Sequence, residues 1–425
     1  MDTNEETIAA KRFHGYNVVM NLDETYRSLT LPTKAKLVLL VLDGLGDIAT
    51  PQTNFLTPLG AARTPNLDAL AKKSALGRIT PIAPGITPGS GPAHLALFGY
   101  DPLAIEVGRG VIEALGLGID LKHGDLAARA NFCTLDGRGL VTDRRAGRIP
   151  TEICQKQCAM LAKAIQKIDG VEVMIRAGES HRFVVVFRGK GLAGPLTDTD
   201  PHREGEPIKA AMSQAKSAGG NKAAALLKKF YAKALPVLKD CKPANGFLLR
   251  GIDGLPKIEN FETRYGLRGA SLAIYPMYKG LAQLVGMTKL DGGHNVKEQF
   301  AALAANREKF DYFFIHVKGT DMAGEDGNFD NKVAVIEEVD AALPQLLATK
   351  PDVLAITGDH STPVPMKGHS WHPVPVLLYG GISNCDGADR FTETTTRSGS
   401  LGTFESKYLL RFMQANAKMF DKFGA

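Results

Sequence analysis

Apolar segments of strand length, several of them followed by acidic residues, constrain the fold of this chain more than any other feature. They are Leu37–Leu42, Phe313–Val317, Val353–Thr357 and Pro373–Leu378. Continuous apolar strands are typical of a parallel sheet that is covered on both faces. Helical patterns lie between them, over residues 66–74, 297–309 and 332–347. The alternation predicts an α/β fold with a doubly wound, mainly parallel sheet.

Acidic residues and histidines follow three of these strands. Asp43 ends the first, Asp321 comes shortly after the second, and Asp359 and His360 follow the third. In doubly wound sheets, ligands bind at the carboxyl ends of the strands. Carboxylate oxygens and imidazole nitrogens are ligands of divalent metals. A single aspartate there is more often a helix cap, but several acids and histidines at one sheet edge favour a metal centre.

Two further residues are candidates for the same centre. Glu325 stands four residues after Asp321, which places both on one face of a helical turn. His369 follows in the loop after the third strand. A two-metal site holds its ions about 3.5–4 Å apart, and these side chains together provide enough ligands for one.

The middle of the chain has a different pattern. Strand-like segments lie over residues 130–135, 171–175 and 182–187, and helical ones over 151–168 and 208–238, the last with an expected break at Gly219–Gly220. This mixture predicts a separate α+β domain inserted into the first. The expected boundaries are a polar N-terminal extension over 1–34, a discontinuous metal-binding domain over 35–118 and 263–425, and an insert over 119–262.

Ser90 is the candidate nucleophile. It stands between Gly89 and Gly91 in a segment that also contains His94. A serine hydroxyl is weakly nucleophilic, and metal coordination is one way to activate it. The flanking glycines allow a tight turn and close approach of backbone N–H groups to a phosphate. Taken alone, the segment also fits an ordinary proline–glycine turn.

Composition excludes several classes of protein. The chain has 425 residues, 44% hydrophobic and 23% charged, which is unlike a disordered or fibrous chain. No apolar run approaches the ~20 residues that span a bilayer, and the polar N-terminus contains no secretory signal. The five cysteines are expected to be reduced thiols. We therefore expect a cytoplasmic protein with no membrane partner.

The charge of the chain gives limited information about its substrate and partners. The net charge of +6 fits a small anionic substrate. The Lys/Arg stripe of a nucleic-acid-binding protein is missing from the sequence. No nucleic-acid partner is expected, and no sequence feature indicates an oligomeric state.

Many short motifs in one order resemble a known family, the archaeal-type 2,3-bisphosphoglycerate-independent phosphoglycerate mutases of the alkaline phosphatase superfamily. The resemblance runs from about Lys36 to Leu410. The motifs are Leu42–Asp47, Thr64–Asp68, Pro88–Ser90 with Ala93–Leu95, Gly99–Pro102, Gly108–Gly110, Asp143–Ile149, His181–Arg182, Thr197–His202, His316–Asp321, Thr357–Pro363, His369–Ser370 and Pro373–Val376.

The resemblance implies an isomerase that interconverts 3-phosphoglycerate and 2-phosphoglycerate in glycolysis and gluconeogenesis, without 2,3-bisphosphoglycerate as cofactor. Ser90 would take the phosphate and return it to the other hydroxyl. Two divalent ions are implied, Mn²⁺ foremost and Mg²⁺, Zn²⁺ or Co²⁺ as alternatives. One ion would be held by Asp43, Ser90, Asp359 and His360, and the other by Asp321, the residue at position 325, and His369.

Position 325 departs from the family, which has a histidine there. Three alternatives stay open. Glu325 replaces the histidine as a ligand, and a carboxylate favours harder ions. Alternatively, Asp326 takes over that role, or the second metal site is weakened and the activity is changed or lost.

Arginines are suited to a substrate that carries a phosphate and a carboxylate, because their planar fork binds both groups bidentately. Four cationic residues fall within family-like motifs, and two aspartates in the same region would orient them or the glycerate hydroxyls. A lysine in a more loosely matching segment completes the expected substrate site. These residues are Arg145, Arg148, Arg182, His202, Asp198, Asp200 and Lys279.

Other functions fit the same residues. A phosphatase or other phosphoester hydrolase would share the metal and serine chemistry. A non-catalytic ligand-binding relative would fit the change at position 325. The native substrate could also be another phosphorylated hydroxy acid.

Overall fold

Strand β3 (Leu37–Leu42) lies at the centre of the sheet that positions the candidate site. The computed structural model describes residues 11–13, 16–18 and 21–424. All six residues of β3 are buried, each at most 1% exposed. Strands β13 (Tyr312–Val317) and β14 (Val353–Thr357) flank it, and both run parallel to it. The carboxyl ends of these three strands therefore meet at one edge.

The full sheet has eight strands in the order β12-β11-β13-β3-β14-β15-β4-β16. The outer strands are β12 (Thr288–Lys289), β11 (Gly269–Ser271), β15 (Val374–Gly380), β4 (Ser74–Thr80) and β16 (Gly402–Glu405). Only β15 runs antiparallel to its neighbours, while all other pairs are parallel. The prediction of an α/β fold with a mainly parallel sheet is confirmed.

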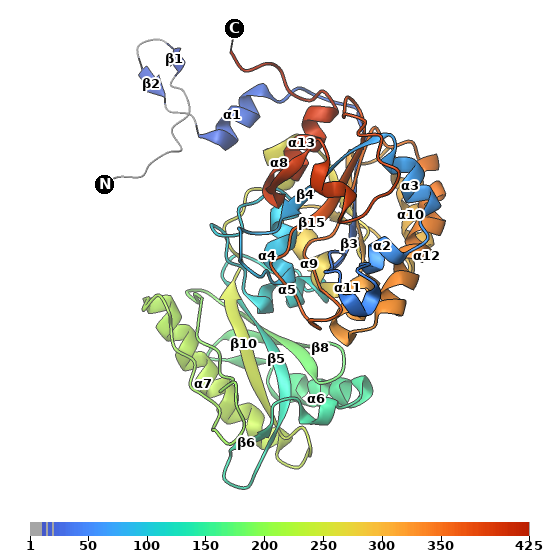
Figure 1. Cartoon of the computed structure of the whole chain (residues 1–425). Helices are drawn as coiled ribbons and strands as arrows, with labels where there is room; N and C mark the ends of the chain where they lie inside the picture. Colours follow the sequence, from blue (N-terminus) through green and yellow to red (C-terminus); the bar gives the residue numbers. More distant parts are fainter. Residues whose placement is uncertain (1–10, 14–15, 19–20, 425) are drawn as a thin grey trace, which may run out of the picture. The chain divides into compact units, whose positions relative to one another are not determined.

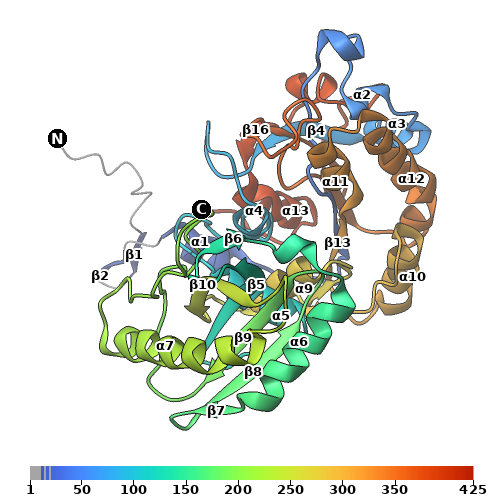
Figure 2. The same ribbon diagram turned by 90° about the horizontal axis from the view of Figure 1, so that it is seen from below.

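Helices cover both faces of this sheet. Those on one side, α3 (Pro65–Ala71), α10 (Val296–Asn306) and α12 (Phe329–Ala348), are grouped together in both views (Figures 1 and 2). Helices α2 (Pro58–Ala61) and α11 (Gly319–Asp326) pack against α12. The remaining helices of this unit include α4 (Ser90–Leu97), α8 (Phe261–Tyr265) and α13 (Leu409–Asn416). Strand β4 begins at Ser74, where the sequence pattern predicted the end of a helix.

The chain forms two compact units. The larger contains the described residues up to Leu103, together with Glu259–Ile274 and the chain from Val285 onward. The smaller contains Ala104–Ile258 and Tyr275–Leu284. Both limits of the smaller unit differ from the insert expected over residues 119–262.

The reason for the difference is the packing of α5 (Arg109–Gly116) and α9 (Pro276–Leu284). Apolar residues of α5 form one cluster with the sheet of the smaller unit. The two helices cross at glycines: a Cβ on Gly116 would lie 2.1 Å from Pro276 O, and one on Gly280 would lie 2.2 Å from Ile112 O. Only residues without a side chain permit this approach.

The sheet of the smaller unit is antiparallel, in the order β10-β5-β9-β8-β7, with β6 paired to β5. Its strands are β5 (Asp125–Leu135), β6 (Val141–Asp143), β7 (Lys167–Ile168), β8 (Val171–Ala177), β9 (Arg182–Arg188) and β10 (Gly246–Gly254). Helices α6 (Thr151–Ala164) and α7 (Ala218–Leu238) pack on one face through a large apolar cluster. Helix α5 packs on the other face.

The expected break at Gly219–Gly220 is wrong. Both glycines lie in the first turn of α7, and Ser217 caps that turn by accepting a hydrogen bond from the Gly220 N–H at 3.0 Å. A Cβ on Gly220 would lie 2.0 Å from Ser213 Oγ. Gly220 is thus required by close packing and does not end the helix.

The expected N-terminal extension falls partly outside the described residues. Its described part contains the antiparallel pair β1 (Lys11–Phe13) and β2 (Tyr16–Val18) and the helix α1 (Leu22–Leu29). A capping box of Asn21 and Glu24 begins α1. The Arg411 guanidinium lies 4.4 Å from the ring centres of both Tyr26 and Tyr265, so α1 is held to the larger unit.

The helices and the cysteines bear on the expectations about membranes and disulfides. Within the described part of the protein, no helix combines the length and apolarity that a membrane span requires. All five cysteines are free, and the Sγ atoms of Cys154 and Cys158 lie 4.0 Å apart.

Candidate active site

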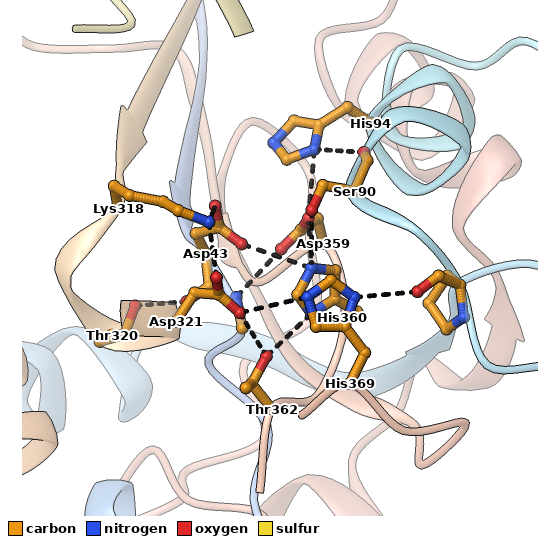
Figure 3. Close-up of polar contacts among 12 residues, drawn as sticks. Asp43, Ser90, His94, Lys318, Thr320, Asp321, Asp359, His360, Thr362 and His369 are labelled. Carbon is orange, nitrogen blue, oxygen red and sulfur yellow. Dashed lines mark hydrogen bonds and ion pairs between the residues drawn. The ribbon is translucent and has the colours of Figure 1, made fainter. Parts of the chain in front are cut away.

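The turn after β3 forms the floor of the candidate site (Figure 3). Gly44 has a φ of +63°, and its N–H donates to Asp359 Oδ1 at 3.0 Å. A Cβ at this position would lie 2.4 Å from Thr362 Oγ1 and 2.8 Å from Asp321 Oδ1. Glycine is therefore required both by the backbone conformation and by the space available. The turn brings Asp43 next to the residues that follow β13 and β14.

The first group of candidate ligands contains Asp43, Asp359 and His360, whose ligand atoms all lie within 4.8 Å of one another. His360 Nε2 lies 3.4 Å from Asp43 Oδ1 and 3.1 Å from Asp359 Oδ2. The Ser90 hydroxyl lies 3.3 Å from the same nitrogen. The aspartates and the histidine are fully buried. The structure thus brings the candidate nucleophile to the group that the resemblance assigned to it.

The second group contains Asp321, His360 and His369. His369 Nε2 lies 3.5 Å from Asp321 Oδ1, and the rings of His360 and His369 stack with centroids 3.7 Å apart. Glu325 Oε1 lies 3.9 Å from His369 Nε2, and its side chain is 55% exposed. Glu325 therefore reaches the edge of this group, while His360 lies within both groups.

These residues fit a divalent metal. Ligand atoms around a tetrahedral ion with bonds of about 2.0–2.1 Å lie about 3.3 Å from one another. The separations from His360 Nε2 to Asp43, Asp359 and Ser90 run from 3.1 to 3.4 Å. The donors are carboxylate, hydroxyl and imidazole, which suit ions between the hard and the borderline class.

Lys318 links the two groups. Its Nζ lies 3.0 Å from Asp43 Oδ2 and 2.5 Å from Asp321 Oδ2, and Figure 3 shows the ammonium between these carboxylates. Burial acts against its charge, but the two aspartates outweigh burial and raise the pKa of Lys318 above its ordinary value. Lys318 therefore neutralises part of the acidic charge.

Histidines support the carboxylates from behind. His94 Nδ1 lies 3.1 Å from Asp359 Oδ2 and 2.9 Å from Ser90 O. His316 Nε2 lies 3.1 Å from Asp43 Oδ2. Burial opposes ionisation of Asp43, yet its hydrogen bond with His316 and the charge of Lys318 hold the pKa of Asp43 well below its usual range. The carboxylate is therefore charged and oriented at neutral pH.

The smaller unit contains a cluster of arginines around the buried His181. Burial and the surrounding guanidinium groups lower the pKa of His181 to about 4. The arginines that exert this effect are Arg182, Arg145, Arg129 and Arg148. Among the described residues, none of the four has a carboxylate within 4 Å. The Nε atoms of Arg129 and Arg182 are also buried without a hydrogen-bond partner there. This cluster combines three of the predicted arginines with Arg129.

The loop after β9 places the other predicted substrate residues in a separate arrangement. Asp200 forms ion pairs with Arg144 and Arg250. Burial disfavours the charge of Asp200, but its contacts, among them the hydrogen bond from Arg144, lower its pKa to about 2. His202 Nε2 lies 3.6 Å from Asp198 Oδ2. These aspartates and His202 line a cavity of about 510 Å³. Lys279 lies on α9.

Comparison with known proteins decides the family. A family model described as 2,3-bisphosphoglycerate-independent phosphoglycerate mutase matches residues 71–245. A relative from Thermotoga neapolitana, named as a probable enzyme of this kind, is 48% identical over 397 residues, 93% of this chain and 98% of its own length. One from Thermus thermophilus is 48% identical over 410 residues, covering 96% of this chain and 100% of its own. The chain belongs to the 2,3-bisphosphoglycerate-independent phosphoglycerate mutase family. The resemblance seen in the sequence is confirmed.

Solved structures agree with the fold of this mutase family member. The cofactor-independent phosphoglycerate mutase of Thermoplasma acidophilum is 30% identical, with a TM-score of 0.70, and the match covers 90% of this chain and 100% of that one. The PH0037 protein of Pyrococcus horikoshii is 32% identical, with a TM-score of 0.79, covering 92% and 100%.

Sequence reasoning left three polar residues of this mutase centre without a role. Lys318 and His316 were read only as part of a strand and a motif, although both stand at the end of β13, where the strand-end rule applies. Thr362 donates to Asp321 Oδ1 at 2.6 Å and lies two residues after His360. For His94, the sequence left open whether it faces Ser90 or packs behind it. In the structure its Nδ1 lies 3.1 Å from Asp359 Oδ2.

Proposed function

We propose that this protein interconverts 3-phosphoglycerate and 2-phosphoglycerate through a phosphoserine at Ser90, without 2,3-bisphosphoglycerate. The observation that carries the proposal is the position of the Ser90 hydroxyl, 3.3 Å from Nε2 of His360, a residue that belongs to both ligand groups. Ser90 is also the first residue of α4, so the positive end of that helix faces an arriving phosphate.

In the forward step, Ser90 Oγ loses its proton and attacks phosphorus, the Oγ–P bond forms and the bond from phosphorus to the 3-oxygen breaks. That oxygen takes up a proton and becomes a hydroxyl of glycerate. Glycerate then turns, its 2-oxygen loses a proton and attacks the phosphoserine, and the Oγ–P bond breaks. The serine is restored, and no atom is gained or lost.

Two divalent ions would activate the Ser90 oxygen and neutralise phosphate charge when bound. The residues that would hold one are Asp43, Ser90, Asp359 and His360, and those for the other are Asp321, Glu325 and His369. Mn²⁺ suits this mixture of carboxylate and imidazole. In their support, Lys318 holds Asp43 and Asp321 in place, and His94 orients Asp359.

The arginine cluster would hold the anionic groups of the substrate while glycerate turns. Arg129, Arg145, Arg148 and Arg182 surround His181 without carboxylate partners among the described residues, as a site for a doubly charged anion would require. Asp198 and His202 would contact the glycerate hydroxyls, Asp200 would position Arg144 and Arg250, and Lys279 would contact phosphate. The proposed setting is cytoplasmic glycolysis and gluconeogenesis.

An enolase-coupled assay tests this function. The protein is loaded in turn with Mn²⁺, Mg²⁺, Zn²⁺ or Co²⁺, and 2-phosphoglycerate formation is measured without 2,3-bisphosphoglycerate. Ser90→Ala should abolish metal-dependent turnover, while Ser398→Ala, at an exposed serine, should leave it unchanged. Release of free phosphate in place of 2-phosphoglycerate, or equal activity of Ser90→Ala, would overturn the proposal.

A further inference from the structure

The larger unit contains a second polar cavity of about 530 Å³, whose lining includes Asp47, Phe55, Thr57, Arg78, His372 and Glu393. None of the candidate metal ligands is among its lining residues in the described part of the chain. Its size is that of a site for a small molecule. The proposed reaction makes no use of it.

One wall of the cavity carries a buried carboxyl group with unused hydrogen-bonding capacity. Thr57 Oγ1 donates to Glu393 Oε2 at 2.5 Å. Glu393 Oε1 is buried and has no hydrogen-bond partner among the described residues. Burial raises the pKa of Glu393 to about 7. Leaving a buried carboxyl oxygen unpaired is costly, so this group is suited to a ligand that donates a hydrogen bond.

Arginines that line the same cavity have the opposite capacity. Arg78 Nη2 donates to Thr403 Oγ1 at 3.1 Å, but Arg78 Nε is buried without a partner in the described structure. Arg397 also lines the cavity and forms no ion pair with the described residues. Guanidinium groups with free N–H donors recognise carboxylates.

The remaining wall is apolar. Phe55 and Leu56 line the cavity although their side chains are 70% and 46% exposed. Phe55 has a φ of +57°, which is uncommon for a residue with a side chain. Such strain persists where the surroundings hold it, often at ligand sites. Pro373 extends the apolar surface on the other side.

We propose that this cavity binds a small zwitterion of the amino-acid class, with its ammonium on Glu393, its carboxylate on Arg78 and its apolar part against Phe55 and Leu56. A dianion such as phosphate would meet the Glu393 carboxyl, and a simple amine would meet the arginines. Only a ligand with both charges meets both the carboxyl group of Glu393 and the arginines of the lining.

Contacts link the cavity to the candidate active site. Asp47 lines the cavity and pairs with the fully buried Lys332 at 2.8 Å. Lys332 Nζ also donates to Thr362 O at 2.9 Å, and the Thr362 hydroxyl donates to Asp321 Oδ1. Trp371, the only tryptophan of the chain, stacks on His372, which lines the cavity. Tryptophan fluorescence therefore reports on occupancy.

The test is a titration of the full-length protein with L-leucine, followed by Trp371 fluorescence and by calorimetry. Leucine should bind saturably. Removing either charge, as in 4-methylpentanoate or 3-methylbutylamine, should weaken binding roughly tenfold or more. 6-Aminohexanoate, whose charges are further apart, shows whether the two anchors prefer a longer zwitterion. The readout is binding alone, so it is independent of mutase turnover.

Variants separate the two anchors. Glu393→Gln and Arg78→Met should each weaken leucine binding at least roughly tenfold, while the exposed Glu308→Gln should bind as the parent does. Absence of saturable binding of both leucine and 6-aminohexanoate up to about 10 mM would overturn the proposal. Analogues without one charge that bind the parent protein as tightly as leucine would also overturn it, even if a variant fails to fold.

Discussion

The two charged clusters of this molecule satisfy their charges in opposite ways. In the larger unit, Asp43 contacts Lys318 and His316, and Asp359 contacts His94 and His360. In the smaller unit, Arg145, Arg148 and Arg182 gather around a neutral histidine and have no carboxylate within 4 Å among the described residues. The first cluster is largely neutralised by the protein itself, and the second is not.

The difference indicates what each cluster is built to receive. A network whose members orient one another is preorganised, so little rearrangement accompanies the binding of an ion. A group of like charges repels itself, and an anion removes that repulsion when it binds. We therefore expect substitutions in the larger unit to affect the chemical step, and those in the arginine cluster to affect substrate affinity.

Asp43→Asn should have the largest effect. It keeps the shape of the side chain but removes the charge that faces Lys318 and His360. We expect kcat to fall roughly 10³-fold or more, with loss of bound metal. The coupled assay and metal analysis after dialysis measure this. Asp330→Asn, at an exposed position of α12, is the control. An Asp43→Asn variant that keeps its metal and its kcat would contradict the assignment.

Arg182→Met should act mainly on KM. Loss of one charge-assisted contact is worth about 2–3 kcal/mol, so kcat/KM should fall roughly 10²-fold. Thermal stability should rise, because a half-buried cation that faces other cations is removed. Steady-state kinetics and thermal melting test the pair of effects. Arg176→Met, at an exposed position of β8, should change neither KM nor thermal stability. If Arg182→Met lowers kcat and leaves KM unchanged, the two clusters do not differ in the way proposed here.

Glu325→Gln examines the edge of the metal centre. Its carboxylate lies 3.9 Å from His369 Nε2 and is half exposed, so we expect a smaller loss of activity, roughly tenfold. The Mn²⁺ concentration for half-maximal activity should increase. If Asp326→Asn has the larger effect of the two, Asp326 is the ligand at this position.

His181→Gln should have the smallest effect, on stability alone. The folded protein holds the pKa of His181 at about 4, against about 6.5 in an unfolded chain. The unfolded state therefore binds more protons between these values, and the free energy of unfolding rises with pH across this window. The variant should lose about 1 kcal/mol of that rise. Denaturant unfolding at pH 4.5 and 7 measures this change in the free energy of unfolding, with the exposed His294→Gln as control. If His181→Gln leaves the pH dependence unchanged, the arginines do not lower the pKa of His181.

Strands buried on both faces could be predicted from the sequence because nothing interrupts their apolar residues. Strands β3 and β14 have the predicted limits, and β13 begins one residue earlier. Strand β4 escaped prediction because its segment contains Gly77 and Arg78. The short strands β11, β12 and β16 carry too few apolar residues. The reversal of β15 has no signal in a continuous apolar pattern.

The candidate site also has a part that could be predicted from the sequence and a part that could not. The residues after parallel strands could be predicted to meet, because topology alone brings them to one edge. The arginine cluster could not, because it depends on antiparallel register: Arg129 on β5 lies opposite Arg250 on β10, and Asn131 lies opposite Arg182 on β9. Family motifs indicated Arg145, Arg148 and Arg182. Arg129 was one of several further arginines outside those motifs, and the paired strands bring it to the cluster.

The position of β3 at the centre of its sheet has a consequence for biosynthesis. Its end residue Asp43 is separated by 273 residues from His316 on the neighbouring strand. At a translation rate of about 5–20 residues per second, the ribosome needs roughly 14–55 s to make the partner after β3 has emerged. Six consecutive apolar residues thus stay unpaired on the nascent chain for most of its synthesis. A chaperone that shields Leu37–Leu42 during this interval would protect the yield of native protein more than one that acts after release.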